Sequence, residues 1–153
     1  MKETSKIRKI AFVGDHLPPK CGMATVQMSE KRHFRSIGRN GFYRRGGSRA
    51  NFDRQPIEAQ ATVSACLEAH RATSDVWWYE HAQRAFDWFL GWIDLGTELN
   101  SPNTGGCRDG LHVDRANRNQ GAESTLAFLL SLAERQLAQN TLTSFKEPIA
   151  IVE

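Results

Sequence analysis

Long apolar runs are missing from this sequence of 153 residues, and cysteine is scarce. No run approaches the roughly 20 apolar residues that a membrane-spanning helix needs, so we expect no membrane span and no membrane partner. The opening MKETSKIRKIAFVG has only a short apolar run and no small-residue cleavage site, so we expect no secretory signal. Cys21, Cys66 and Cys107 are odd in number and far apart, which indicates reduced thiols in a cytoplasmic protein.

Motifs that would hold a metal or a nucleotide are absent as well. Cys107 and His112 lie near carboxylates in the sequence, but no second cysteine or helical histidine pair accompanies them, so we expect no metal site. The loop from Gly14 to Gly22 follows an apolar run, yet its spacing matches neither GxGxxG nor a P-loop. We interpret this loop as a vestigial arm rather than a phosphate-binding loop, and we predict no cofactor.

Charge is distributed unevenly along the chain. Residues 1–54 hold 13 Lys/Arg against 4 Asp/Glu, whereas residues 55–153 hold 7 against 13. A basic segment at 31–54 is able to neutralise nucleic-acid phosphates. No recognised nucleic-acid fold surrounds it, and Phe42 and Tyr43 are its only adjacent aromatic pair. We therefore expect no nucleic-acid partner and suspect that the two halves differ in origin.

The spacing of apolar residues, together with the Gly, Pro and capping residues between them, predicts a mainly α fold. The apolar run at 7–14 predicts a short strand, and the glycine-rich segment 31–54 predicts a basic loop. Three long helices are predicted, from Gln55-Pro56 to Thr73, from Val76 to Ile93 with Ser74-Asp75 as its cap, and from Asn119 to Ala138. A loop of about 25 residues separates the second and third helices, and loops of this length are usually functional or disordered.

The predicted helices differ in their apolar faces. The second has a wide apolar stripe that includes Trp78 and Phe86, and we assign Trp78 to the core. In the third helix the apolar residues gather on one face: Ala122, Leu126, Leu129, Leu130, Ala133 and Leu137.

Two stretches of the chain resemble a known family. RKIAFVGDHLPPKCGMAT (8–25) is similar to the first strand and loop of bacterial retaining glycosyltransferases with two Rossmann-like halves. Residues 36–134, with the strings QPIEA, TGGCRDGLH and NRNQGAEST, resemble the C-terminal helical region of a group of these enzymes. That region is similar to a toroid of paired helices, as in the six-hairpin glycosidases. The resemblance thus implies a partial α/α toroid and a carbohydrate-active protein.

The resemblance also implies that a large internal part is missing. In the family, hundreds of residues, including the donor-sugar-binding half, separate the two matching segments, which meet here near Met28–Phe34. We therefore divide the chain into a glycosyltransferase remnant (1–30), a toroid fragment (31–138) and a tail (139–153). We expect a truncated, glycosyltransferase-related protein that does not carry out hexosyl transfer alone.

Candidate site residues gather around the long loop and the start of the third helix. Glycosidic chemistry uses two carboxylates, and Asp109 with Glu123 provides such a pair. The structural alternative is that Asn119 caps the third helix and Glu123 completes the capping network. We expect the polar groups to converge on one sugar-binding concavity with Trp88 or Trp92 as its wall, and its further polar residues are Arg45, His112, Asn119 and Gln120.

A non-enzymatic function is the alternative. A partial toroid leaves helix faces that neighbouring hairpins would otherwise cover, and such exposed apolar surface favours self-association or binding of a partner.

Overall fold

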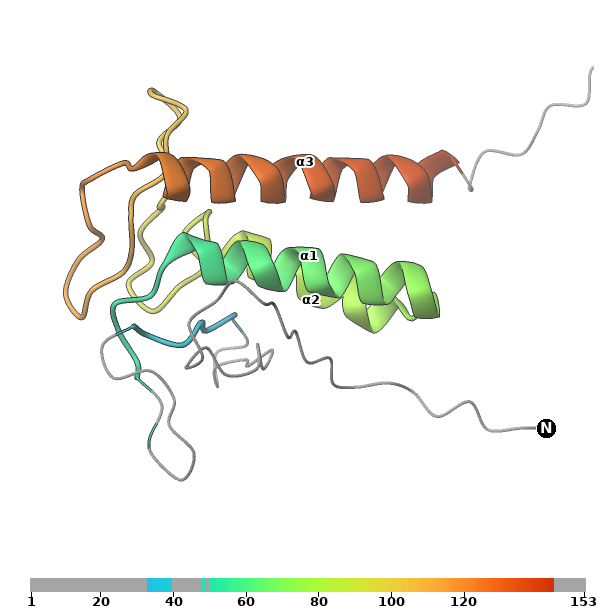
Figure 1. Cartoon of the computed structure of the whole chain (residues 1–153), viewed down its shortest axis with the longest axis horizontal. Coiled ribbons are helices and arrows are strands. Elements are labelled where there is room, and N and C mark those ends of the chain that lie inside the picture. Colours follow the sequence, from blue (N-terminus) through green and yellow to red (C-terminus); the bar gives the residue numbers. More distant parts are fainter. Residues whose placement is uncertain (1–32, 40–47, 49, 145–153) are drawn as a thin grey trace, which may run out of the picture.

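The computed structural model describes residues 33–39, 48 and 50–144 and shows a mainly helical fold (Figure 1). Helix α1 spans Pro56–Thr73, α2 spans Val76–Asp87 and α3 spans Ala122–Ser144. None of the helices in these residues is long and apolar enough to cross a membrane. The strand predicted at 7–14 and the candidate residue Arg45 lie outside the described residues.

Local sequence explains the first two helix starts and the turn between them. Pro56 occupies the first turn of α1, where a missing amide hydrogen costs no helical hydrogen bond. Ser74 ends α1 in a left-handed conformation (φ 55°), and its amide donates to the His70 carbonyl at 2.7 Å. The Asp75 side chain then accepts from the Trp77 amide at 3.0 Å, which confirms the predicted cap of α2.

Two helix boundaries differ from the sequence prediction. Helix α2 ends at Asp87 rather than Ile93, because Gly91 adopts a φ of 96° and the chain turns there. Helix α3 begins three residues later than predicted, at Ala122, and continues past Ala138 to Ser144. Asn119 and Gln120 therefore belong to the long loop rather than to the helix.

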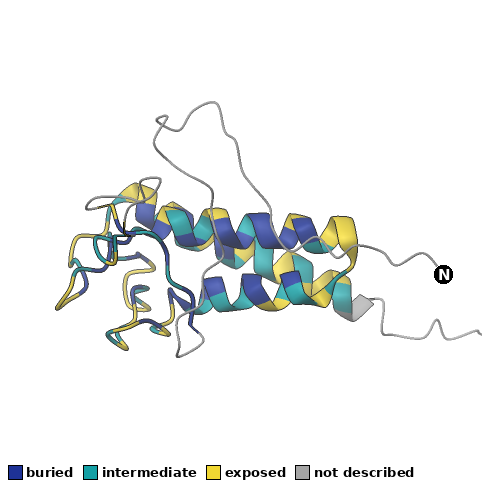
Figure 2. Cartoon of the chain, turned by 90° about the horizontal axis from the view of Figure 1, so that it is seen from below, coloured by how far each residue is buried: buried dark blue, intermediate teal, exposed yellow. Residues whose placement is uncertain are grey.

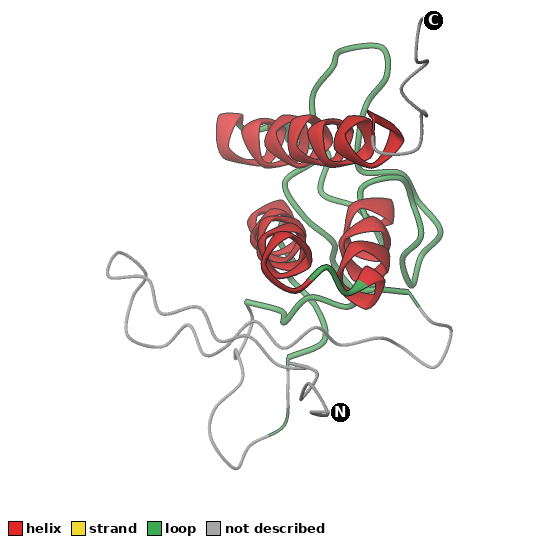
Figure 3. Ribbon diagram, turned by 90° about the vertical axis from the view of Figure 1, so that its right-hand side faces the viewer, coloured by secondary structure: helices red, strands yellow, loops and turns green. Residues whose placement is uncertain are grey.

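Helix α1 is the central element of the fold. It packs against both α2 and α3, whereas α2 and α3 make few contacts with each other. Figure 3 shows α1 and α2 side by side, with α3 lying above them. Among the described residues no other helix covers the outer side of α3 (Figures 1 and 3).

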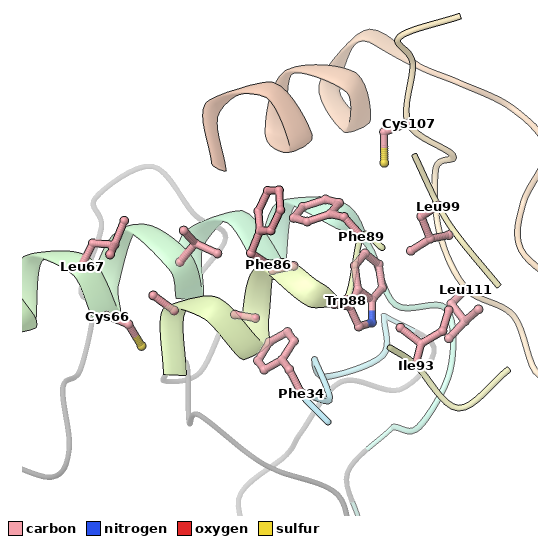
Figure 4. Close-up of a cluster of buried hydrophobic side chains, with 14 of the residues drawn as sticks. Phe34, Cys66, Leu67, Phe86, Trp88, Phe89, Ile93, Leu99, Cys107 and Leu111 are labelled. Carbon is pink, nitrogen blue, oxygen red and sulfur yellow. The ribbon is translucent and has the colours of Figure 1, made fainter. Parts of the chain in front are cut away.

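The core joins the helices to the connecting loop (Figure 4). Trp78, as predicted, is buried, and the ring of Phe86 stacks on Phe128 of α3 with centroids 6.1 Å apart. The loop supplies further core residues, and it is tied down by antiparallel bridges, including Arg54 with Leu111 and Asn100 with Cys107. Figure 2 shows buried positions in both the helices and the loop, with exposed residues at the loop tips. Fully buried core residues from the loop region are Trp88, Phe89, Leu99, Cys107 and Leu111.

Helix α3 packs with a face that differs from its apolar one. Ser124, Ala127 and Ser131 are buried. The leucines on the predicted apolar face are instead exposed, with exposed fractions of 56% for Leu126, 44% for Leu129, 51% for Leu130 and 62% for Leu137. The third helix is thus amphipathic, but the face that packs on the rest of the molecule combines the small residues Ser124, Ala127 and Ser131 with the partly buried Phe128 and Leu132.

Candidate functional site

A cleft lies where the N-terminal ends of α1 and α3 come together. We call it the α1–α3 cleft; its volume is about 250 Å³, and its lining includes both predicted carboxylates. The residues that give it its chemistry are Arg39, Gln55, Ile57, Asp109, Glu123 and Ser124.

Asp109 is held in this cleft as a capping residue of α3. Its carboxylate accepts a hydrogen bond from the Gly121 amide at 2.7 Å, from the Asn119 side chain, and from Ser124. These donors belong to the first turn of α3 and the residues just before it, where amide groups lack helical acceptors. A Cβ at Gly121 would come within 2.9 Å of the Asp109 carboxylate, so glycine permits this close approach.

These contacts determine the ionisation of Asp109. Partial burial alone would raise the pKa of its carboxyl group, but the hydrogen bonds from Gly121, Ser124 and Asn119 outweigh it. The pKa of Asp109 is therefore lowered below its ordinary value. At neutral pH the group is an ionised acceptor, suited to binding hydroxyls or acting as a base, and unsuited to act as a general acid.

Glu123 lies in the first turn of α3, and its side chain is exposed. The positive end of the helix dipole favours a carboxylate at this position. The predicted capping network is thus organised differently from the sequence interpretation. Asp109, twelve residues before Gly121, is the capping group, and Asn119 donates to it rather than capping the helix itself.

The remaining predicted site residues do not all converge on this cleft. The Gln120 side chain accepts from the Thr104 hydroxyl at 2.8 Å and is exposed. His112 is directed toward another acidic group, with its Nδ1 4.0 Å from an oxygen of Asp53. Of the predicted site residues that the structure describes, only Asp109, Asn119 and Glu123 are brought together.

The two candidate tryptophans are separated from the α1–α3 cleft. Trp88 is fully buried in the core, so it has no face to offer a sugar, and the expectation that it forms a cavity wall is wrong. Trp92 is 69% exposed and lines a different cavity of about 340 Å³, together with His33, Leu90 and Glu98. The turn at Gly91 explains why Trp88 and Trp92 lie in different places, since it breaks the helical i, i+4 relation expected between the two rings.

An ionic cluster around the buried Arg54 was not predicted from the sequence. Arg54 is fully buried, and its guanidinium lies 2.6 Å from Asp94, which is also 2.9 Å from His33. Burial lowers the pKa of Arg54 despite the opposing carboxylate. Hydrogen bonding and charge from Arg54 lower the pKa of Asp94 more than its partial burial raises it. The cluster anchors residues 33–39 to the turn after α2, and in the sequence Arg54 looked like one more cation of a basic loop.

The described cysteines, Cys66 and Cys107, are buried and unreactive. Burial raises the pKa of the Cys66 thiol to about 12, and burial with the nearby charge of Asp109 raises that of Cys107 to about 12. Both are free, and neither is suited to nucleophilic chemistry near neutral pH. No group of three or more His, Cys, Asp or Glu in the described part of the chain is arranged to hold a metal ion.

Comparison with known proteins gives no family match and no match to a curated protein. The resemblance to glycosyltransferases rests on the sequence strings given above.

Proposed function

We propose that this chain is a glycosyltransferase-related helical module that binds carbohydrate in the α1–α3 cleft and does not transfer sugar by itself. The observation that carries the proposal is the presence of Asp109 and Glu123 in one cleft, at the joined ends of two helices. The resemblance of TGGCRDGLH and NRNQGAEST, which contain these two residues, to a carbohydrate-active family supports the same proposal. The free, buried Cys66 and Cys107 fit a cytoplasmic protein.

The chemistry of the cleft suits a small neutral sugar. The carboxyl oxygens of Asp109 and Glu123 are able to accept hydrogen bonds from hydroxyls, while Arg39 and Gln55 are able to donate them. Ile57 supplies an apolar patch against which a sugar ring can pack. At about 250 Å³ the cleft is smaller than the roughly 300–1,000 Å³ of pockets for drug-sized ligands. We expect it to accept one terminal ring with an affinity on the order of millimolar, or about −4 kcal/mol.

The capped Asp109 has a lowered pKa, which excludes it as the general acid of glycoside cleavage but leaves it suited to the role of the carboxylate. The resemblance further implies that the half of the family that binds the donor sugar is missing. We expect no hydrolysis of nucleotide-sugars and no transfer from them.

The first prediction concerns Glu123→Gln. This variant removes the charge of one cleft carboxylate and leaves the Asp109 cap intact, so sugar binding should weaken at least severalfold. Stability should fall by no more than about 1 kcal/mol, the contribution of a carboxylate to the helix dipole. The measurement is a titration of the full chain with neutral oligosaccharides, followed by amide chemical shifts. Glu80→Gln is the matched control, because Glu80 is an exposed carboxylate on α2 and does not line the cleft.

Shifts confined to the start of α3, the 104–114 loop and the start of α1 would support the proposal. Shifts that centre on Trp92, or an equal loss of binding in both variants, would rule out the cleft as the sugar site. Turnover of a nucleotide-sugar that Glu123→Gln abolishes would show instead that the chain is a complete enzyme.

A second candidate function is favoured by a different feature. Helix α3 presents four exposed leucines on its outer side, which is the surface expected of a module that associates through a helix. This function does not depend on the sugar cleft, and the two are compatible in one chain.

A further inference from the structure

The outer side of α3 carries a continuous apolar surface, which we call the leucine stripe. It consists of Leu126, Leu129, Leu130 and Leu137, with the exposed Ala122 and Ala133 in line with them. Each leucine is exposed by 44% or more. With a rise of 1.5 Å per residue, Leu126 to Leu137 extends over roughly 16 Å along the helix. Monomeric soluble proteins seldom expose contiguous apolar patches larger than a few hundred Å².

The spacing of the stripe suits another helix. Ala122, Leu126, Leu129 and Ala133 follow one another at intervals of four, three and four residues. This alternation is the seam with which two helices pack side by side, and small alanines between leucines let the partner approach closely.

Charged residues of α3 are directed away from the stripe. Glu134 accepts a hydrogen bond from Ser64 of α1 at 2.6 Å, and Arg135 donates to Gln83 of α2 at 2.5 Å. Glu123 lines the α1–α3 cleft. The stripe itself is uncharged, so pairing with an identical surface would bury no unpaired charge within it.

We propose that the occupant of the leucine stripe is a second copy of this chain, bound α3 against α3 about a two-fold axis. A two-fold interface uses the same patch on both copies, so one stripe per chain is sufficient and the assembly closes at two. The other exposed large apolar residues among those described do not form a second helical stripe. Ile57, Val76 and Val113 lie apart on α1, the start of α2 and the loop, whereas Leu90 and Trp92 line one cavity.

The area of the stripe determines how strong the dimer is. Four leucines, each about half exposed, amount to roughly 300–400 Å² per copy, at the scale of the largest patches on monomers. Two such faces fall well below the roughly 1,600 Å² of a standard stable interface. The dimer is therefore a weak one, in a concentration-dependent equilibrium with the monomer.

Sedimentation velocity of the full chain tests the proposal. Between about 1 μM and about 500 μM, which brackets weak association, the apparent mass should rise from 17.2 kDa toward twice that value. The double variant Leu129→Glu/Leu130→Glu should weaken the dimer at least tenfold while helicity measured by circular dichroism is retained. Val76→Glu is the matched control, because Val76 is 59% exposed but lies on α2, and it should dimerise as the wild type does.

Several results would overturn the proposal. These are a wild-type chain that stays monomeric at the highest concentration, equal weakening by Val76→Glu, or a charged double variant that dimerises unchanged. Species larger than a dimer would contradict the two-fold closure. If the charged variant loses helicity, Leu129→Ala/Leu130→Ala replaces it, with a weaker dimer expected and an unchanged dimer contradicting the idea. None of these readouts involves sugar, so the stripe and the α1–α3 cleft can fail independently.

Discussion

Asp109 has two tasks at the residue scale. The group proposed to bind sugar hydroxyls is also the cap of α3, through the Gly121 amide and the Ser124 and Asn119 side chains. A substitution of Asp109 therefore changes both sugar binding and stability, whereas a substitution of Glu123 tests binding with the α3 cap still in place. The cap was beyond prediction from sequence, because a hydrogen bond between residues 109 and 121 depends on how the whole loop folds.

Removing the carboxylate of Asp109 should destabilise the chain in a pH-dependent way. Asp109→Ala loses a helix cap, so we expect a loss of about 1 kcal/mol in the free energy of unfolding at pH 7. The folded-state pKa is lowered, so the contribution is fully present above the unfolded pKa of about 3.9. As pH falls through the lower folded-state value the contribution disappears, and the variant and the wild type should converge in acid.

Urea unfolding at pH 7 and near pH 3 measures this difference. Asp114→Ala is the control, because Asp114 is exposed and pairs with its neighbour Arg115 at 2.9 Å. A loss for Asp109→Ala that is the same at both pH values would contradict a charge-dependent cap.

At the scale of the element, the periodicity of α3 predicts which face is apolar but not which face packs on the rest of the molecule. The spacing of Leu126, Leu129 and Leu130 identified the apolar face, but it could not say that Ser124 and Ser131 would face the rest of the molecule. Side-chain volume explains why these serines lie on the packed face, since small residues let α3 approach α1 closely. The buried Ser131 hydroxyl donates a hydrogen bond to the Ala127 carbonyl at 2.8 Å, so it does not need a partner on another element.

Two substitutions on opposite sides of α3 should therefore affect stability in an unusual order, with the change at a serine costing more than the truncation of a leucine. Ser131→Leu adds volume at a fully buried position and should destabilise the chain by about 1–3 kcal/mol. Leu130→Ala removes a half-exposed side chain and should change stability by no more than about 0.5 kcal/mol. Thermal or urea unfolding near 1 μM, where the proposed dimer is dissociated, measures both. The reverse order of effects would mean that the apolar face is the packed one.

At the scale of the whole molecule, the sequence predicted the mainly helical class, the bounds of α1 and the start of α2, but not the end of α2. The start of α1 at Pro56 and the Asp75 cap depend on neighbouring residues, and such local features can be predicted from a sequence. The partners of Arg54 and Asp109, and the burial of Trp88, depend on distant segments. Those are the features that local patterns could not reveal.

Two truncations test where the cooperative unit begins. Deleting residues 1–28 leaves every described core residue in place, so the melting temperature and helicity should stay nearly unchanged. Deleting residues 1–39 also removes Phe34, which is 3% exposed in the core, and His33, which bonds Asp94 at 2.9 Å. That deletion should cost at least about 3 kcal/mol. Melting followed by circular dichroism makes the comparison, and a large loss already at the shorter deletion would show that the first segment docks on the helices.

The central position of α1 has a consequence for the entropy of the chain. Its two partners are tethered very differently, because only Ser74 and Asp75 join α1 to α2, whereas the chain from residue 88 to residue 121 separates α2 from α3. Closing a loop becomes costlier as it lengthens, by about 0.6 kcal/mol for each doubling. Helix α3 thus returns to α1 across the longest connection among the described helices. The bonds of Asp109 with Gly121 and of Ser64 with Glu134, together with the packing of Phe128, offset that cost.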